Sequence, residues 1–404
     1  MRTVHPIVKP EDTGSPIGRS RHVPTRRPRH CGFLVPATFL CACLLLSACA
    51  GSHEGLRTAE PAAPGRARIA VFPVENLSGS VAPSHEIRGF FLARLQAAGF
   101  EVVDDDSLDQ VMTRHRVRYT AGVDRELALA LKHEAAVEAI LIPSLELYDE
   151  TNPPKVAMFS RLVSTGDSPA VLWIDGVGMA GDDSPGLLGL GLVDDPTALL
   201  AKAVDTLVGS LVRDGSAASK NLVGREGARK FRPKLVYRSD ALIPDKKYSV
   251  AVAPFFNKTD RKYAGEILAL HMIRNLMTFQ NFEIVEPGIV RQELLRFRII
   301  MTDGVSLPET ETILNAVNAD LVLNGEVLDY RDYRGPDGVA KVDFSVLFIE
   351  RRTRQVVYSS YSQNQGNDGV FFFDWGRVNT AHAMASRMAR AVGEKMLQAG
   401  QRGR

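Results

Sequence analysis

Histidine, serine and acidic side chains could serve as catalytic or metal-ligating groups in this chain of 404 residues. Metal binding or general-base catalysis on one helix usually needs a His-x-x-x-His or His-Glu-x-x-His spacing. The histidines beyond residue 50 are too far apart for either pattern: His53, His85, His115, His133, His271 and His382. The sequence also lacks a Gly-x-Ser-x-Gly nucleophile turn and a Walker-type phosphate loop. We therefore expect no catalytic residue, no metal site, no cofactor and no enzymatic activity.

Three weaker features each have two interpretations. The run 104–106 of three aspartates could hold a hard cation, but acidic residues also favour the positive end of a helix dipole, which we prefer. The glycine-rich stretch 186–192 could be a nucleotide loop, but no Lys-Ser/Thr follows it. Asn76 and Asn257 each follow a strand that ends at proline, where Asn more often closes a turn than binds a ligand.

The cysteines are confined to the first part of the chain, at Cys31, Cys41, Cys43 and Cys49. The string Leu46-Ser47-Ala48-Cys49 closes an apolar run that begins at Phe33 and follows several arginines. This resembles the lipobox of bacterial lipoproteins, which implies that residues 1–48 are a cleaved signal peptide and that Cys49 carries a diacylglycerol and a palmitate. A retained membrane helix is less favoured, because the run has about 16 residues and a span needs roughly 20.

Cleavage before Cys49 would leave one cysteine, which excludes an intramolecular disulfide and a cysteine-ligated zinc site. Ala50 stands where enterobacterial inner-membrane retention signals have Asp, so the resemblance implies a protein anchored in the outer membrane and facing the periplasm. Seven of the 49 basic residues and two of the 47 acidic residues precede Cys49. The remainder is slightly acidic, and we expect no nucleic-acid partner.

Two segments of the remaining chain resemble each other in order and spacing. The first opens with Arg68-Ile-Ala-Val-Phe-Pro73 and the second with Ser249-Val-Ala-Val-Ala-Pro254. Gly99-Phe-Glu-Val-Val103 then matches Asn281-Phe-Glu-Ile-Val285, and a third match follows at 136–142 and 316–323. Ordered matches at a spacing that stays near 181 residues indicate an internal duplication.

Each copy shows the pattern of strand, helix, strand, two helices, strand, hairpin and closing helix. Val342, Phe344, Val346 and Phe348 alternate with polar residues, as a half-buried hairpin strand does. In the first copy we expect the hairpin strands at 156–163 and 171–174. The pattern predicts an α/β protein of two tandem mixed-sheet domains with the same fold. The expected segments are a signal peptide (1–48), a tether (49–66), the first domain (67–214), a basic linker (215–247) and the second domain (248–400).

The order of these motifs, with Phe282-Glu-Ile-Val-Glu-Pro287 and Ala319-Asp-Leu-Val-Leu-Asn-Gly-Glu-Val327 in the better-matching copy, resembles a known domain family. It is the α/β domain shared by the N-terminal part of TolB, the curli-export lipoprotein CsgG and the penicillin-binding-protein activator LpoB. The resemblance implies a non-enzymatic envelope lipoprotein that acts as a scaffold or accessory subunit for an outer-membrane or periplasmic complex. The alternative is a subunit of a CsgG-like export channel, and a homo-oligomer is possible in either case.

One aromatic segment precedes the closing helix of the second copy: Phe371, Phe372, Phe373 and Trp375. Leu187, Leu188, Leu190 and Leu192 occupy the same place in the first copy. So many aromatic residues in an expected loop exceed what a soluble surface usually shows. They either pack over the sheet edge as core or form a contact patch for an envelope protein, and we select them as candidate partner-binding residues.

Overall fold

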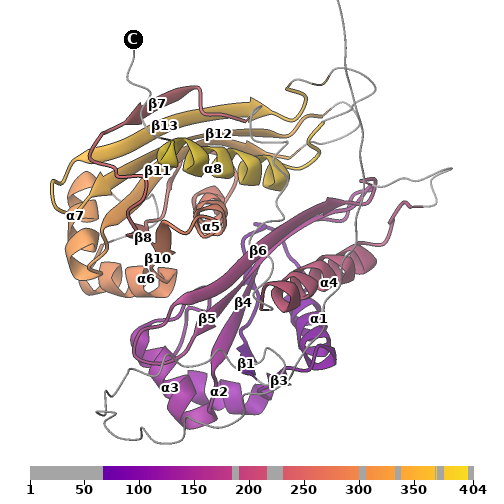
Figure 1. Cartoon of the computed structure of the whole chain (residues 1–404). Coiled ribbons are helices and arrows are strands. Elements are labelled where there is room, and N and C mark those ends of the chain that lie inside the picture. The colour runs from indigo at the N-terminus through magenta and orange to yellow at the C-terminus, as the bar shows by residue number, and fades with distance from the viewer. Residues whose placement is uncertain are drawn as a thin grey trace, which may run out of the picture. The chain divides into compact units, whose positions relative to one another are not determined.

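The computed structural model describes residues 67–183, 191–215, 231–299, 306–332, 338–368, 370 and 377–398. They belong to one compact unit, which contains two mixed β-sheets with helices against them (Figure 1). The predicted lipidation site Cys49 and the aromatic residues Phe371, Phe372, Phe373 and Trp375 lie outside the described residues.

The first sheet has the strand order β3-β1-β4-β5-β6, with β2 paired to β4 beside this path. Its strands are β1 (Arg68–Val71), β2 (Glu75–Asn76), β3 (Glu101–Val102), β4 (Ala139–Asp149), β5 (Lys155–Ser164) and β6 (Val171–Ala180). Strand β1 pairs in parallel with β3 and β4, whereas β4, β5 and β6 form an antiparallel meander.

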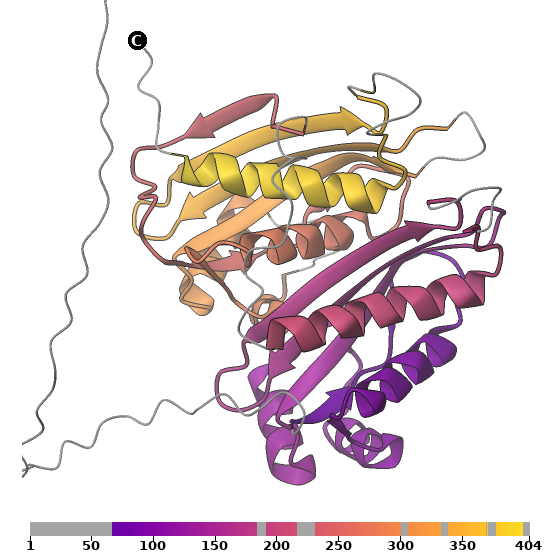
Figure 2. The same cartoon turned by 45° about the vertical axis from the view of Figure 1, so that its right-hand side comes forward.

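Four helices cover the two faces of the first sheet: α1 (Ser84–Ala97), α2 (Asp105–Arg114), α3 (Arg125–Ala135) and α4 (Pro196–Gly215). One face packs on α1 and α4, which lie side by side (Figure 2), and the other on α2 and α3. Helix starts follow the sequence, since the side chains of Asp104 and Asp124 cap α2 and α3 by accepting from backbone N–H groups. Asp104 therefore serves as the helix cap that we preferred for the aspartate run.

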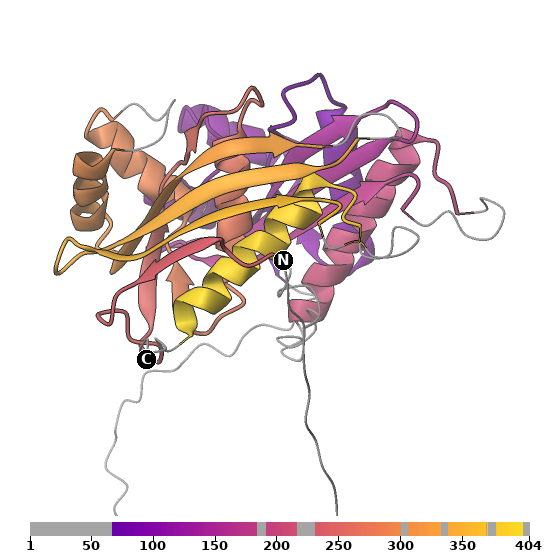
Figure 3. The same ribbon diagram turned by 90° about the horizontal axis from the view of Figure 1, so that it is seen from above.

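The second sheet has the order β10-β8-β11-β12-β13-β7, with β9 paired to β11. Its strands are β7 (Leu235–Arg238), β8 (Tyr248–Val252), β9 (Phe256–Asn257), β10 (Phe282–Ile284), β11 (Leu321–Arg331), β12 (Lys341–Glu350) and β13 (Val356–Gln365). Its helices are α5 (Ala264–Leu276), α6 (Pro287–Arg296), α7 (Leu307–Ala316) and α8 (Ala381–Leu397). Seen from above, α8 runs along the long strands β12 and β13 (Figure 3).

Apart from β7, the second sheet repeats the strand order of the first, element for element. The structure therefore confirms the predicted α/β class with two mixed sheets. A common origin of the two copies by duplication stays a prediction, as do the domain boundaries.

Two elements differ from the sequence-based expectation. Strand β6 continues beyond the expected 171–174 to Ala180, through Asp175, Gly176 and Gly178, because these residues pair with β5 over its whole length. The predicted linker 215–247 contains β7, which extends the second sheet by pairing antiparallel with β13. Phe231 and Leu242 on either side of β7 are buried, so this part of the segment belongs to the fold.

The core of the second copy continues into the first. One buried cluster contains residues of β8, β11, β12, α5 and α8 together with Leu77, Phe159 and Ile174 of the first copy. Helix α5 is buried on nearly all sides, as expected for a helix that packs on its own sheet and on a neighbour. Among the described residues, none of the helices has the length and apolar character that a membrane crossing requires.

Gly288 in α6 marks a close backbone approach between the two copies. A Cβ atom at this position would lie 2.2 Å from the backbone nitrogen of Val123, which precedes α3. The backbones meet here without room for any side chain, so only glycine fits unless one chain segment moves.

We predict that Gly288→Ala lowers the free energy of unfolding by about 1–3 kcal/mol, the range for overpacked sites. The matched control is Gly89→Ala in α1, where a Cβ meets no neighbouring atom. That change should leave stability equal or slightly raised, because Ala favours a helix over Gly by about 1 kcal/mol. Denaturant unfolding of both variants measures the difference, and an equally stable Gly288→Ala variant would show that the approach is not tight.

Candidate functional site

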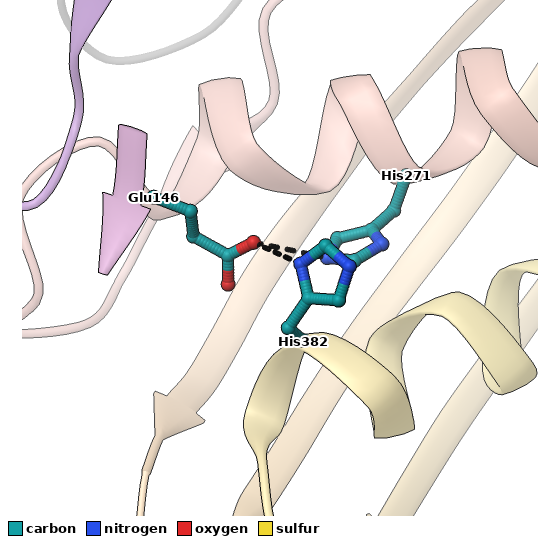
Figure 4. Close-up of side chains that lie close together, drawn as sticks. All are labelled: Glu146, His271 and His382. Carbon is teal, nitrogen blue, oxygen red and sulfur yellow. Dashed lines mark hydrogen bonds and ion pairs between the residues drawn. The ribbon is translucent and has the colours of Figure 1, made fainter. Parts of the chain in front are cut away.

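Three ionisable side chains from distant parts of the sequence meet in the buried region between the two copies (Figure 4). Glu146 comes from β4 of the first copy, whereas His271 and His382 come from α5 and α8 of the second. Glu146 Oε2 lies 2.5 Å from His382 Nδ1 and 3.6 Å from His271 Nε2. Glu146 and His271 are completely buried and His382 nearly so. We call these three residues the Glu–His–His cluster.

A β-bulge directs Glu146 toward the histidines. Leu145 pairs with Met158 and Leu147 with Ala157, so Glu146 is the extra residue of β4. A bulge of this kind re-aims one side chain while pairing continues on both sides. The opposite copy has a similar irregularity in β11, between Val327 and Asp329.

Two glycines of β6 make room for the cluster. A Cβ atom at Gly176 would lie 2.7 Å from the Phe159 ring, and one at Gly178 would lie 2.9 Å from His382 Cβ. The Phe159 ring in turn stands edge-on to His271, with centroids 4.7 Å apart, and lies 4.9 Å from His382. Gly176 and Gly178, which lie in the part of β6 beyond the expected strand, are thus the residues that let α8 approach the sheet.

Tyr330 and Arg261 complete the polar surroundings of Glu146. The Tyr330 hydroxyl donates to Glu146 Oε1 at 2.6 Å and lies 3.1 Å from His271 Nε2. Arg261 donates to the backbone carbonyl of Glu146 at 2.8 Å, and its guanidinium lies 4.7 Å from the centre of the Tyr330 ring. Arg261 also pairs with Asp332, which accepts from the backbone N–H of Ala381 at the start of α8.

These contacts determine the protonation of the cluster. Burial raises the pKa of Glu146, but His382 and His271 outweigh it and hold the pKa well below its ordinary value. Burial lowers the pKa of His271 from 6.5 to about 4, against the opposing effect of Glu146. Burial also raises the pKa of Tyr330 well above its ordinary value, so this hydroxyl remains a donor. Glu146 is therefore an anion at neutral pH, and His271 is neutral.

The arrangement suits hydrogen bonding better than it suits a metal ion. Glu146 Oε2 and His382 Nδ1 are in direct hydrogen-bonding contact, so the two groups already satisfy each other. The Arg261 cation lies 3.9 Å from Glu146, where a second cation would be repelled. Metal-bound histidines usually donate their other N–H, but His271 Nδ1 and His382 Nε2 have no partner.

The Glu–His–His cluster can act as a buried, charged contact that holds the two copies together through hydrogen bonds. Its atoms are closed to solvent, so a substrate has no access to them in this structure. Arg274 of α5 adds a second polar contact across the same boundary, because its guanidinium lies 2.7 Å from Asp175 on β6. The cluster joins the copies through hydrogen bonds that each copy alone leaves unmade.

The sequence analysis did not find this cluster. Its three residues come from three elements far apart in the sequence, so no short sequence motif contains them. One local signal was present, since Glu146 stands between Leu145 and Leu147 in an otherwise apolar strand. A charged residue in a buried strand requires a partner, although the sequence does not say which one.

Asn76 and Asn257 have the turn role that we preferred for them. Asn76 accepts from the backbone N–H of Ser78 and donates to the carbonyl of Ser80, at 3.0 and 2.7 Å. Asn257 makes the same two bonds to Thr259 and Arg261, with the same distances. Leu192, at the edge of the apolar stretch in the first copy, is exposed, whereas Leu187, Leu188 and Leu190 lie outside the described residues.

No family model matches this chain, and no curated protein matches it either. Several solved structures are similar to parts of it. A variant PelC dodecamer from Paraburkholderia phytofirmans is 21% identical, with 41% of this chain and 98% of that chain covered and a TM-score of 0.29. Lipoprotein GNA1162 from Neisseria meningitidis is 19% identical, with 36% and 99% covered and a TM-score of 0.27.

LpoB from E. coli is 14% identical, with 30% of this chain and 58% of that chain covered and a TM-score of 0.24. Each of these three matches spans less than half of the present chain. Because the identities and TM-scores are this low, none of them carries an argument about what the protein does.

We predict that Glu146→Ala destabilises the protein by about 3–5 kcal/mol, the usual effect of removing one member of a buried charged pair. The substitution leaves buried donors on His382 and Tyr330 without their acceptor. Glu138→Ala, at an exposed position just before β4, is the control and should change stability little. Thermal and denaturant unfolding measure both. A loss below about 1 kcal/mol for Glu146→Ala would contradict the conclusion that the Glu146 carboxylate stabilises the contact between the two copies.

The pKa of His271 predicts a loss of stability in acid. The unfolded chain takes up a proton near pH 6.5, whereas the folded protein resists protonation until about pH 4. The stability that His271 contributes is thus complete above pH 6.5 and is lost as the pH falls toward 4, by about 3 kcal/mol in total. The lowered pKa of Glu146 acts in the same direction at lower pH.

Unfolding measured between these pH values should show a smaller acid loss for His271→Gln than for the wild type. The same substitution at the exposed residue His133 is the control and should leave the pH profile unchanged. Parallel profiles for wild type and His271→Gln would mean that His271 is not kept neutral by the fold.

Proposed function

We propose that this protein is a non-enzymatic lipoprotein of the cell envelope, anchored through Cys49 and acting as a scaffold or accessory subunit for envelope proteins. The observation that carries the proposal is the string Leu46-Ser47-Ala48-Cys49 after a short apolar run with a basic flank. A lipid-modified cysteine carries more than one acyl chain, which is enough for stable anchoring. Ala50 favours the outer membrane, with the folded part in the periplasm.

The structure supports a binding role more than a catalytic one. Within the residues that it describes, His and carboxylate side chains gather in one group that could hold a metal ion, and that group is closed to solvent. A scaffold, in contrast, needs persistent surfaces, and the shared core and the buried joint keep the two sheets together. We further propose that the aromatic segment Phe371–Trp375 contacts a partner.

The first test is lipidation. Radiolabelled palmitate should enter the wild type and not Cys49→Ser, which should also leave the outer-membrane fraction. Cys43→Ser is the matched control, because this residue would be removed with the signal peptide. Equal labelling of the wild type and Cys49→Ser would refute the anchor and with it the proposed compartment.

The second test addresses partners. Proteins crosslinked to the wild type in intact envelopes should be lost from Phe372→Ala and Trp375→Ala while thermal unfolding stays unchanged. A large drop in melting temperature would instead place these aromatics in the core. The mass of the protein in detergent separates a monomeric accessory subunit from a large ring, as the export-channel alternative requires.

A further inference from the structure

A cavity of about 710 Å³ lies between the first copy and helices α5 and α6 of the second. Its volume is in the range of small-molecule sites, about 300–1,000 Å³. It is separate from the Glu–His–His cluster, since none of the three cluster residues lines it. Two kinds of surface meet in it, an apolar one from α5 and α6 and a polar one largely from the first copy (helices α5 and α6 are labelled in Figure 1).

The apolar wall is formed by aliphatic side chains of the second copy. Helix α5 contributes Leu270 and Ile273, and α6 and its following turn contribute Val290, Leu294, Leu295 and Ile299. Leu295 is more than half exposed, so this wall presents apolar surface to the cavity opening. This wall offers a surface for an aliphatic chain.

The polar wall combines Glu75, Tyr119 and Arg161 of the first copy with Arg291 of α6. Arg161 is buried, bonds to the carbonyl of Ala121 and lies 3.4 Å from Glu286 Oε1. The guanidinium of Arg291 stacks on the Tyr119 ring at 3.9 Å. Both arginines keep a buried Nε without a hydrogen-bond partner. Buried donors without acceptors are costly, so an acceptor from a bound molecule would stabilise this wall.

The charges of the wall leave room for one negative group. Glu286 offsets Arg161, whereas Arg291 has no ion pair of this kind among the described residues and its charge acts on Glu75, as does the charge of Glu266. Burial raises the pKa of Glu75 to about 7, although Arg161 and a hydrogen bond from Ser144 oppose the shift. Near neutral pH Glu75 is partly protonated, and in that form it donates a hydrogen bond to an anionic oxygen.

We propose that this cavity binds a small amphipathic carboxylate, with its carboxylate held by Arg291 and Arg161 and its aliphatic tail laid against α5 and α6. A guanidinium edge matches the planar carboxylate with two parallel hydrogen bonds. The apolar wall adds stabilisation in proportion to the area of the tail removed from water. The proposal does not depend on the lipid anchor or on a protein partner.

Isothermal titration with decanoate tests the proposal, with the full chain held in an amphipol and the amphipol alone as the blank. Decanoate should bind, decanol should bind much more weakly because it lacks the charge, and acetate should not bind because it lacks the tail. Arg291→Gln should weaken decanoate binding about tenfold or more, as expected for the loss of a charge-assisted hydrogen bond. Arg296→Gln, on the same helix but outside the cavity, is the matched control.

Two further variants make the result specific. Leu295→Asp should weaken the binding of decanoate and of decanol alike, because it acts on the apolar wall. Raising the pH from about 6 to about 8 should weaken decanoate binding in the wild type as Glu75 ionises, and Glu75→Gln should remove this dependence. Absence of decanoate binding, equal binding of decanol, or an unchanged affinity in Arg291→Gln would each overturn the proposal.

Discussion

The carboxylate of Glu146 is completely buried between two packed copies, and much of the surrounding structure follows from that constraint. A buried charge is tolerated only when partners surround it. His382 and Tyr330 bind its two oxygens, and Arg261 binds its backbone carbonyl and lies near the charge. All of these partners come from the second copy. The first copy therefore does not supply the hydrogen-bond partners of Glu146 itself. The folding of the two copies is coupled through this residue.

Local departures from regular secondary structure make the Glu–His–His cluster possible. The bulge in β4 turns Glu146 out of the regular alternation of the strand. Gly176 and Gly178 have no side chains, so Phe159 and His382 can pack directly against the backbone of β6. At another point of the boundary, Gly288 lets α6 touch the backbone near Val123. Several irregular positions therefore lie where the copies meet and allow their close packing.

The same boundary also leaves a cavity beside the joint. At the Glu–His–His cluster the charge of Glu146 is met by donors of the opposite copy, whereas in the cavity Arg161 and Arg291 each keep a buried Nε without an acceptor. The Glu146 carboxylate is enclosed by protein, and the two arginines border an open cavity.

Most helices and strands, and their order, could be predicted from the sequence, because they follow from local periodicity. The alternation from Val342 to Phe348 predicted β12, and the matched motifs predicted two copies with the same strand order. It misjudged β6 and β7, since glycines and charges outweighed pairing partners that lie far away in the chain. The Glu–His–His cluster and the cavity, in contrast, depend on tertiary packing. Glu146, His271 and His382 are brought together by packing between copies, and no spacing along a chain encodes which distant side chains will share a buried charge.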